Sequence, residues 1–141
     1  MWKSIHTGLI AGPPVAMGRP RLARSGHAYT PPKSREYMQH AIDTIKNDWG
    51  DAPPLAKTPL KLCVQFIHRR PARIKGPGRV LKTTKPDIDN LIKMVMDAIS
   101  KSGVWVDDNL VVEIQATDYY ANAYETPHTM YTIYNHQPEI Q

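Results

Sequence analysis

Hydrophobic and polar residues alternate along several stretches of the chain, which is the pattern of β-strands. Residues 60–67 alternate Leu, Leu, Val and Phe with Lys, Cys, Gln and Ile, so we predict a strand with one face well buried. Residues 3–11 predict a first strand, which a Gly-Pro-Pro sequence ends. Two more strands are predicted at 111–116 and 129–133, antiparallel to each other around a turn near 122–127. Together these stretches predict one sheet.

Apolar residues at helical spacing mark two other stretches. Residues 34–49 predict a helix that Gly50 and a Pro-Pro pair end, and residues 87–102 predict a second helix that Gly103 ends. We find no internal repeat, and the predicted fold class is therefore α+β, a single mixed or antiparallel sheet packed by two helices. The apolar positions of the two helices are Tyr37, Met38, Ala41, Ile42 and Ile45, and Ile88, Leu91, Ile92, Val95, Ala98 and Ile99.

The length and composition fit one ordinary globular domain. With 41% hydrophobic content, residues 1–141 can bury a single core but leave no room for a second. No apolar run approaches the roughly 20 residues that a membrane helix needs, and the N-terminus lacks the apolar stretch of a signal peptide. We therefore expect a cytoplasmic protein with no membrane partner. The single cysteine, Cys63, can form no internal disulfide and no thiolate zinc site.

Charge divides the chain into a basic part and an acidic part. Residues 1–85 hold 16 of the 18 Lys and Arg residues against four acids, a net charge of +12. The remaining residues carry two lysines against nine acids, a net charge of −7, so that the whole chain has +5. A basic surface can hold the backbone of a phosphate polymer, and acids that have bound a metal can act on it. A solvated basic face with an acidic tail is the alternative, and charge alone does not decide between the two.

Two basic stretches are candidates for contacts with DNA. Residues 19–30 predict a short hairpin or irregular arm with a Ser-Gly pair at its turn. Residues 68–85 contain no acid and are interrupted by Pro and Gly, so they predict a long mobile loop that orders on DNA binding, with a plain flexible linker as the alternative. The candidate DNA-binding residues are Arg19, Arg21 and Arg24 in the arm, and Arg69, Arg70, Arg73, Lys75, Arg79, Lys82 and Lys85 in the loop.

Four aspartates and a lysine follow the basic loop. Asp87 and Asp89 flank one residue, Lys93 follows four residues later, and Asp107 and Asp108 are adjacent further along the chain. Neighbouring carboxylates raise one another's affinity for protons, and a divalent cation relieves this repulsion. Asp oxygens suit Mg²⁺ or Mn²⁺, and two such ions can stabilise both the attacking and the leaving oxygen when a phosphodiester is cut. The aspartates therefore predict a metal site and a nuclease.

The same acids also have a purely structural interpretation. Asp87 could cap the second helix, Asp89 could pair with the lysine one turn later, and the adjacent pair could belong to an ordinary turn. The tight reversal at 102–103 favours the functional interpretation, because it can fold the later acids back towards the helix. Asp97 lies two turns after Asp89 on the same side of the helix, and we expect it to have only a supporting role.

The acids belong to a longer pattern of acids, lysine, glycine and tryptophan. Residues 85–93 read Lys-Pro-Asp-Ile-Asp-Asn-Leu-Ile-Lys, and an Asp-Ala-Ile sequence leads to Gly-Val-Trp-Val-Asp-Asp at 103–108. This pattern resembles the signature of the RusA family of Holliday junction resolvases. A Gly-Arg-Pro-Arg sequence at 18–21 and Ala-Tyr-Thr-Pro at 28–31 resemble the branch of that family found in phages and prophages. The resemblance covers about residues 12–118, most of the chain.

This resemblance implies a small homodimeric α+β endonuclease that needs Mg²⁺ or Mn²⁺ and cuts four-way DNA junctions by paired nicks. The essential acids of the family match Asp87, Asp89 and Asp108, and its essential lysine matches Lys93. We expect Asp107 to be an outer metal ligand or a positioning residue. One chain holds one such set of acids, whereas resolving a junction requires two opposed cuts, so a homodimer with twofold symmetry follows.

One position departs from the family pattern. Where some members have an arginine just before the first aspartate, this chain has Pro86. The phosphate contact of that arginine is then left to Lys85 or Arg79.

We therefore predict a Mg²⁺-dependent, structure-selective endodeoxyribonuclease that resolves Holliday junctions in branched DNA by paired symmetric nicks, in DNA recombination, DNA repair or phage DNA processing. Water attacks the scissile phosphorus, and Lys93 stabilises the developing negative charge or orients that water. A non-catalytic branched-DNA-binding protein of the same fold is the main alternative. The six histidines show no zinc-ligand spacing, and an Asp-x-Asp glycosyltransferase would not explain the basic loop.

Overall fold

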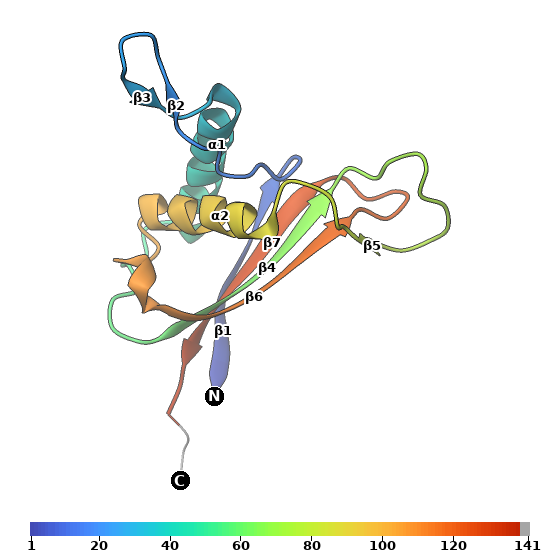
Figure 1. The fold of residues 1–141 in the computed structure, drawn as a ribbon. Coiled ribbons are helices and arrows are strands. Elements are labelled where there is room, and N and C mark those ends of the chain that lie inside the picture. Colours follow the sequence, from blue (N-terminus) through green and yellow to red (C-terminus); the bar gives the residue numbers. More distant parts are fainter. Residues whose placement is uncertain (139–141) are drawn as a thin grey trace.

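The computed structural model describes residues 1–138, in which two helices pack against one face of a five-stranded sheet (Figure 1). This arrangement confirms the predicted α+β class. No helix in this range has the length and apolar character needed to cross a membrane. The sheet strands are β1 (Trp2–Ala11), β4 (Leu60–His68), β5 (Val80–Leu81), β6 (Val111–Tyr120) and β7 (His128–His136). The other elements are the hairpin strands β2 (Arg21–Leu22) and β3 (Ala28–Tyr29), the helices α1 (Pro32–Trp49) and α2 (Ile88–Ser102), and the short 3-10 helix η1 (Asp108–Leu110).

The strand order in the sheet is β1-β7-β4-β6-β5. The strands β4 and β6 are parallel and are connected through α2, whereas the other neighbouring strands are antiparallel. The last two strands do not form the hairpin expected from the sequence, because β4 lies between them and pairs with both. A crossover helix returns the chain beside β4 in the parallel direction, and β7 then occupies the other side of β4. This crossover places the start of α2 near the end of β6.

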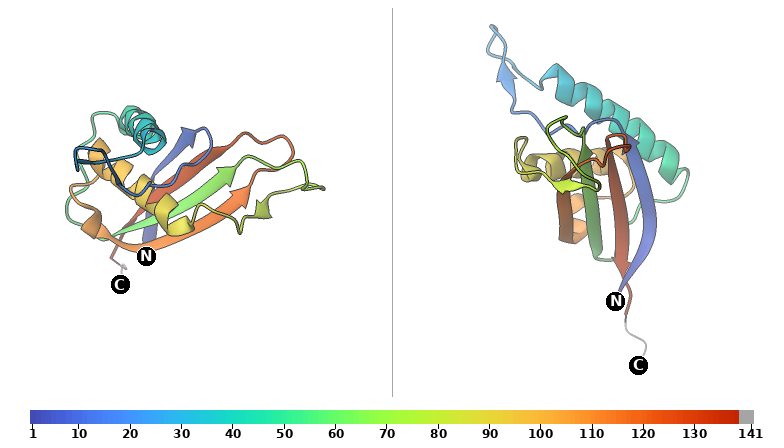
Figure 2. Two further views of the ribbon diagram at one scale, coloured as in Figure 1. Left: turned by 45° about the horizontal axis from the view of Figure 1, so that its top comes forward. Right: turned by 90° about the vertical axis from the view of Figure 1, so that its right-hand side faces the viewer.

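The core lies between the sheet and the two helices (Figure 2). Leu62 and Val64 of β4 pack there with Leu91 and Val95 of α2, and all four side chains are buried, as the predicted alternation and helical spacing require. After α2, Gly103 adopts a left-handed conformation (φ 80°), which a residue without Cβ adopts at little cost. The chain then reverses as the sequence predicted.

Two basic segments lie at the periphery of the core. The hairpin β2–β3 extends beyond the start of α1 (Figure 1), and Gly26 lies at its turn with φ 80°. In the second segment, β5 joins the sheet by pairing with the last two residues of β6. Residues 69–79 contain turns and bends but no helix or strand. Their mobility in solution stays a prediction.

Candidate active site

Asp87 and Asp89 lie at the start of α2, and both are exposed. Asp87 occupies the N-cap position, but its side chain makes no capping hydrogen bond. The Asp89 carboxylate accepts a hydrogen bond from the backbone N–H of Asn90 at 2.9 Å, and within residues 1–138 it forms no ion pair with Lys93. The two structural roles considered for these acids, a helix cap and a surface ion pair, are therefore not found. The helix dipole favours negative charge at this position.

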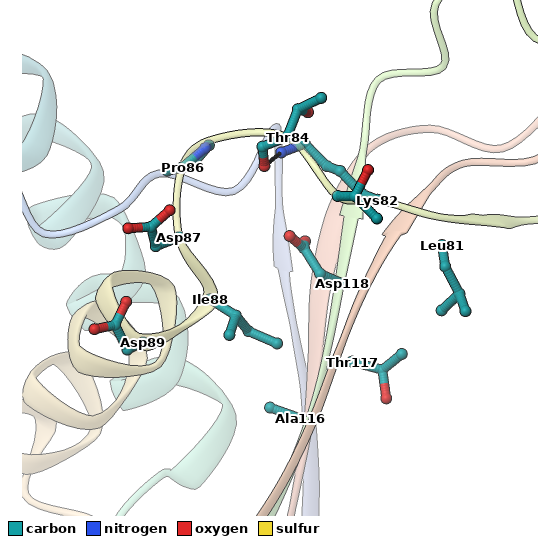
Figure 3. A pocket seen from close by; sticks show the side chains of 11 residues that line it. Leu81, Lys82, Thr84, Pro86, Asp87, Ile88, Asp89, Ala116, Thr117 and Asp118 are labelled. Carbon is teal, nitrogen blue, oxygen red and sulfur yellow. Dashed lines mark hydrogen bonds between the residues drawn. The ribbon is translucent and has the colours of Figure 1, made fainter.

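A surface cavity of about 560 Å³ opens beside these two acids. It lies between the start of α2, the segment that precedes it and the end of β6 (Figure 3). Asp118 of β6 contributes a third carboxylate to the lining, together with Lys82 and Thr84. The exposed carboxylates thus border space that an ion or a DNA strand can enter.

A second group of acids lies at the opposite end of α2. Asp97, Asp107 and Asp108 line a hollow there together with Lys101. The Asp107 carboxylate accepts a hydrogen bond from the backbone N–H of Asn109 at 3.0 Å, so this residue does have the turn-forming role considered for it. A hydrogen bond with Asp107 and the negative charges of Asp107 and Asp97 raise the pKa of Asp108. A cation would relieve this repulsion.

The structure separates the acids that the sequence was expected to bring together. We call Asp87 and Asp89 the Asp87 end of α2, and Asp97, Asp107 and Asp108 the Asp108 end. Asp89 and Asp97 are eight residues apart on α2, which separates them by about 12 Å along the helix at 1.5 Å per residue, and Asp107 and Asp108 lie beside Asp97. The reversal after α2 brings the later acids only to the C-terminal half of the helix. In the part of the chain that the structure describes, no group of three or more His, Cys, Asp or Glu side chains could hold a metal ion. Carboxylate oxygens at both ends suit Mg²⁺ or Mn²⁺ chemically, but each end supplies only part of a ligand set.

Basic residues of the hairpin lie on the same side as the Asp87 end. A groove beside α1 is lined by Arg19, Arg21 and Lys33 and also by Pro86, the residue before Asp87. The backbone N–H of Met17 donates to the Asn90 carbonyl at 3.0 Å, which joins the base of the hairpin to the first turn of α2. The third hairpin arginine, Arg24, is exposed at the turn.

Several basic residues of the 68–85 segment are bound within the protein. The guanidinium of Arg70 donates to three backbone carbonyls, those of Gly76, Gly78 and Ala121, at 2.5 to 3.0 Å. Arg79 forms an ion pair with Glu125, which lowers the pKa of that carboxyl. Arg73 lies over the Tyr120 ring, and Lys82 donates to two backbone carbonyls. The other basic residues of the segment, Arg69, Lys75 and Lys85, are exposed.

Comparison with known proteins supports the resemblance seen in the sequence. The family model described as "Endodeoxyribonuclease RusA" matches residues 11–132, a span that contains both ends of α2 and both basic segments. The chain belongs to the RusA family. A relative from Bacillus subtilis (strain 168), described as "Uncharacterized protein YqaN", is 28% identical over 124 residues, covering 79% of this chain and 85% of the relative. Membership in the RusA family makes the protein an endodeoxyribonuclease, a hydrolase that acts on DNA.

This RusA family protein has a buried polar pair to which the sequence analysis gave no role. His68 Nε2 and Asp118 Oδ1 are 2.6 Å apart, and both residues are at most 9% exposed. Burial lowers the pKa of His68 against the opposing charge of Asp118, and it raises the pKa of Asp118 against the opposing charges of His68 and Lys82. A neutral imidazole that donates to the carboxylate fits these directions. A signal was present in the sequence, because Asp118 occupies an inward-facing position of β6 opposite Phe66.

Proposed function

We propose that this RusA family protein is a Mg²⁺- or Mn²⁺-dependent endonuclease that resolves four-way DNA junctions by paired symmetric nicks. One observation carries the proposal: Asp87 and Asp89 are exposed, have no structural partner among the side chains, and border an open cavity next to a basic groove. Such carboxylates form no ion pair within the described residues, and they suit metal binding beside a DNA strand. DNA recombination, DNA repair and phage DNA processing all use such an activity.

Each of the proposed catalytic residues has a distinct role. Asp87, Asp89 and Asp108 hold the ions, with Asp107 as an outer ligand or a positioning residue. A divalent ion bound there would lower the pKa of a water molecule and neutralise negative charge on the phosphate. Lys93 lies one turn after Asp89 and is exposed, so its ammonium group can contact phosphate oxygens as they gain negative charge.

Because the acids at neither end of α2 form a complete metal site in the described residues, we propose that a second copy of the chain completes each site. If the α2 helices of two subunits run antiparallel about a twofold axis, the Asp87 end of each subunit lies beside the Asp108 end of the other. Two equivalent sites then form, each with carboxylates from both subunits. Two sites related by a twofold axis suit the two opposed cuts that a junction requires.

The free edge of β6 is the surface that we propose for this dimer. Because β5 pairs only with the last two residues of β6, the rest of this edge has no partner strand in the described chain. Val112 and Ile114 on β6 are 64% and 42% exposed, and Ile88 on α2 is 37% exposed. An unpaired edge with exposed apolar side chains is a template for pairing with another strand. Antiparallel pairing of β6 with its copy would set the two α2 helices antiparallel as well.

DNA would approach the Asp87 end between the two basic segments. Lys85 is exposed two residues before Asp87, and we propose that it makes the phosphate contact of the arginine that some family members have there. Arg79 is less suited to that role because Glu125 already binds it. The exposed residues proposed to contact phosphates are Arg19, Arg21 and Arg24 in the hairpin, and Arg69, Arg73, Lys75 and Lys85 in the second segment.

A junction-cleavage assay tests this proposal. The protein is incubated with a synthetic four-way junction or a matched linear duplex, in Mg²⁺, Mn²⁺ or EDTA, and any nicks are mapped on each strand. We expect paired nicks in opposite strands of the junction, none in the duplex, and none in EDTA. An Asp87→Asn variant purified in parallel controls for a contaminating nuclease. Tight junction binding without nicks in either metal would favour the non-catalytic alternative.

A further inference from the structure

The Lys82 side chain turns inward, towards the segment that leads into α2. Its Nζ donates to the carbonyl of Thr84 at 2.7 Å and to the carbonyl of Lys85 at 2.9 Å. These carbonyls belong to the residues just before Pro86 and Asp87. An ammonium group has three donors, so two of them are already used on the backbone. A lysine in this arrangement holds a turn together, whereas a lysine that contacts phosphate projects into solvent.

The end of β6 holds Lys82 in place. The backbone N–H of Lys82 donates to the Asp118 carbonyl at 3.0 Å, and its Nζ lies 5.9 Å from the centre of the Tyr120 ring. The positive charge of Lys82 also opposes the rise in the pKa of Asp118 that burial causes. His68 fixes the same carboxylate from the other side at 2.6 Å.

Tyr120 also binds the segment directly. Its hydroxyl and the Thr84 hydroxyl are 2.8 Å apart. Asp118 and Tyr120 are two residues apart on β6, so their side chains lie on the same face of the strand, beside residues 82–86. Buried side chains of β6 thus connect to the backbone immediately before Asp87.

We propose that Lys82, supported by Asp118 and Tyr120, is a positioning residue for Asp87 and makes no contact with DNA phosphates. Moving the ammonium group to a phosphate would leave two carbonyls without their donor and would separate a charge from the buried carboxylate of Asp118. The present contacts instead fix the direction in which the chain enters α2, and with it the position of the Asp87 carboxylate. This inference rests on the proposed function in one respect, because the proposed function is what assigns a metal ion to Asp87.

The variant that tests this proposal is Lys82→Met, which keeps the apolar stem over Tyr120 and removes the donors. Lys57→Met, at an exposed lysine in the loop before β4, is the matched control. Hydrogen exchange is measured without metal or DNA at the backbone amides of Lys82, Asn90 and Leu91, which donate to the Asp118 and Asp87 carbonyls at the two ends of this segment. We expect about tenfold faster exchange there in Lys82→Met and no change in the control, because charge-assisted hydrogen bonds close this segment. Lys82→Arg, which retains donors, should restore much of the protection.

Two further readouts separate positioning from phosphate binding. Junction binding in EDTA is measured over a range of salt concentrations, and Mn²⁺ binding is measured by titration. A positioning residue leaves the salt dependence unchanged and weakens Mn²⁺ binding several-fold, whereas loss of a phosphate contact lowers the salt slope by about one. A lowered slope with unchanged exchange at Lys82, Asn90 and Leu91 would overturn the proposal.

A second variant keeps the test decisive if Lys82→Met does not fold. Tyr120→Phe removes only the hydroxyl that bonds Thr84, and we expect it to raise exchange at Lys82, Asn90 and Leu91 by a smaller factor. Unchanged exchange in that variant would count against the proposal. Failure of the wild-type protein to nick any junction would reject the proposed function, but it would leave the exchange and salt-dependence results able to decide the role of Lys82.

Discussion

At the Asp87 end of α2 the two carboxylates border an open cavity, whereas at the Asp108 end Asp107 and Asp97 raise the pKa of Asp108 and the Asp107 carboxylate accepts from the backbone of a turn. The helix dipole adds to this difference, because its positive end favours the acids at the start of the helix. Lys101 in the last turn lies in the same hollow as the acids of the Asp108 end and offsets part of their repulsion. A cation bound at the Asp108 end would therefore relieve the repulsion between the carboxylates there. The carboxylates at the Asp87 end are exposed without destabilising the fold.

The comparison also shows how acids proposed to share a metal site can lie apart in one chain. Asp89 and Asp97 are separated by about 12 Å along α2 at 1.5 Å per residue, and Asp108 lies beside Asp97. In the proposed dimer a second molecule brings the two ends together. Four sets of variants test this comparison, in decreasing order of the expected effect.

The largest effect is expected from Asp89→Asn at the Asp87 end. Junction cutting should fall by at least about 10²-fold, because a ligand is lost at the reacting phosphate. Junction binding in EDTA should be unchanged or tighter, since a negative charge near phosphate is removed. Rates of single-turnover cleavage and binding isotherms measure the two quantities. Asp51→Asn, at an exposed turn after α1, is the control. A fully active Asp89→Asn variant would remove this residue from the proposed site.

Mixed dimers test directly whether the two ends of α2 meet across subunits. Asp89→Asn and Asp108→Asn are each inactive as homodimers by the proposal. In a dimer that contains one chain of each kind, one composite site carries both substitutions and the other carries neither. Mixing the two variants should therefore restore nicking of one strand.

The control for this experiment mixes Asp87→Asn with Asp89→Asn, both at the same end. Each composite site of that mixed dimer has one substitution, so no activity should return. If the first mixture were as inactive as the control, each site would lie within one chain, and the comparison of the two ends would lose its functional meaning.

A moderate effect is expected from Arg24→Ala and Arg70→Ala, which sharpen the account of how DNA reaches the Asp87 end. Arg24 is exposed at the hairpin turn, so its loss should weaken junction binding and lower the salt slope by about one without changing stability. Arg70 donates to three carbonyls, so its loss should reduce the free energy of unfolding by about 1–3 kcal/mol. Thermal denaturation and salt-dependent binding separate the two cases, and a lowered salt slope in a stable Arg70→Ala protein would assign that arginine to DNA.

The smallest effect is expected from Asp108→Asn on stability in the absence of metal. The raised pKa of Asp108 means that the folded state binds its proton more tightly than the unfolded state does, so the charged carboxylate destabilises the fold once the pH exceeds the usual range of this group. Asparagine should therefore stabilise the protein at pH 7, by less than about 1 kcal/mol because water screens this exposed site. The gain should disappear near pH 3, and chemical denaturation at both pH values measures it. A loss of stability at pH 7 would contradict the repulsion inferred at the Asp108 end.

Much of the fold could be predicted from periodicity. The helices at 32–49 and 88–102 and the strand at 60–68 agree closely with the predicted stretches, because local spacing of apolar residues decides which backbone conformation buries them. The pairing of β7 with β4 could not be predicted, because strand neighbours are chosen by contacts between residues far apart in the sequence.

The sequence by itself determined that this chain is a RusA family endodeoxyribonuclease with an α+β fold, because the spacing of acids, lysine, glycine and tryptophan is a local property that needs no coordinates. Only the tertiary structure decided where those acids lie. The length of α2 sets the distance between its ends, and the burial of Asp118 and Tyr120 directs Lys82 towards the backbone before Asp87. Both are consequences of packing in three dimensions, which a linear pattern of residues does not contain.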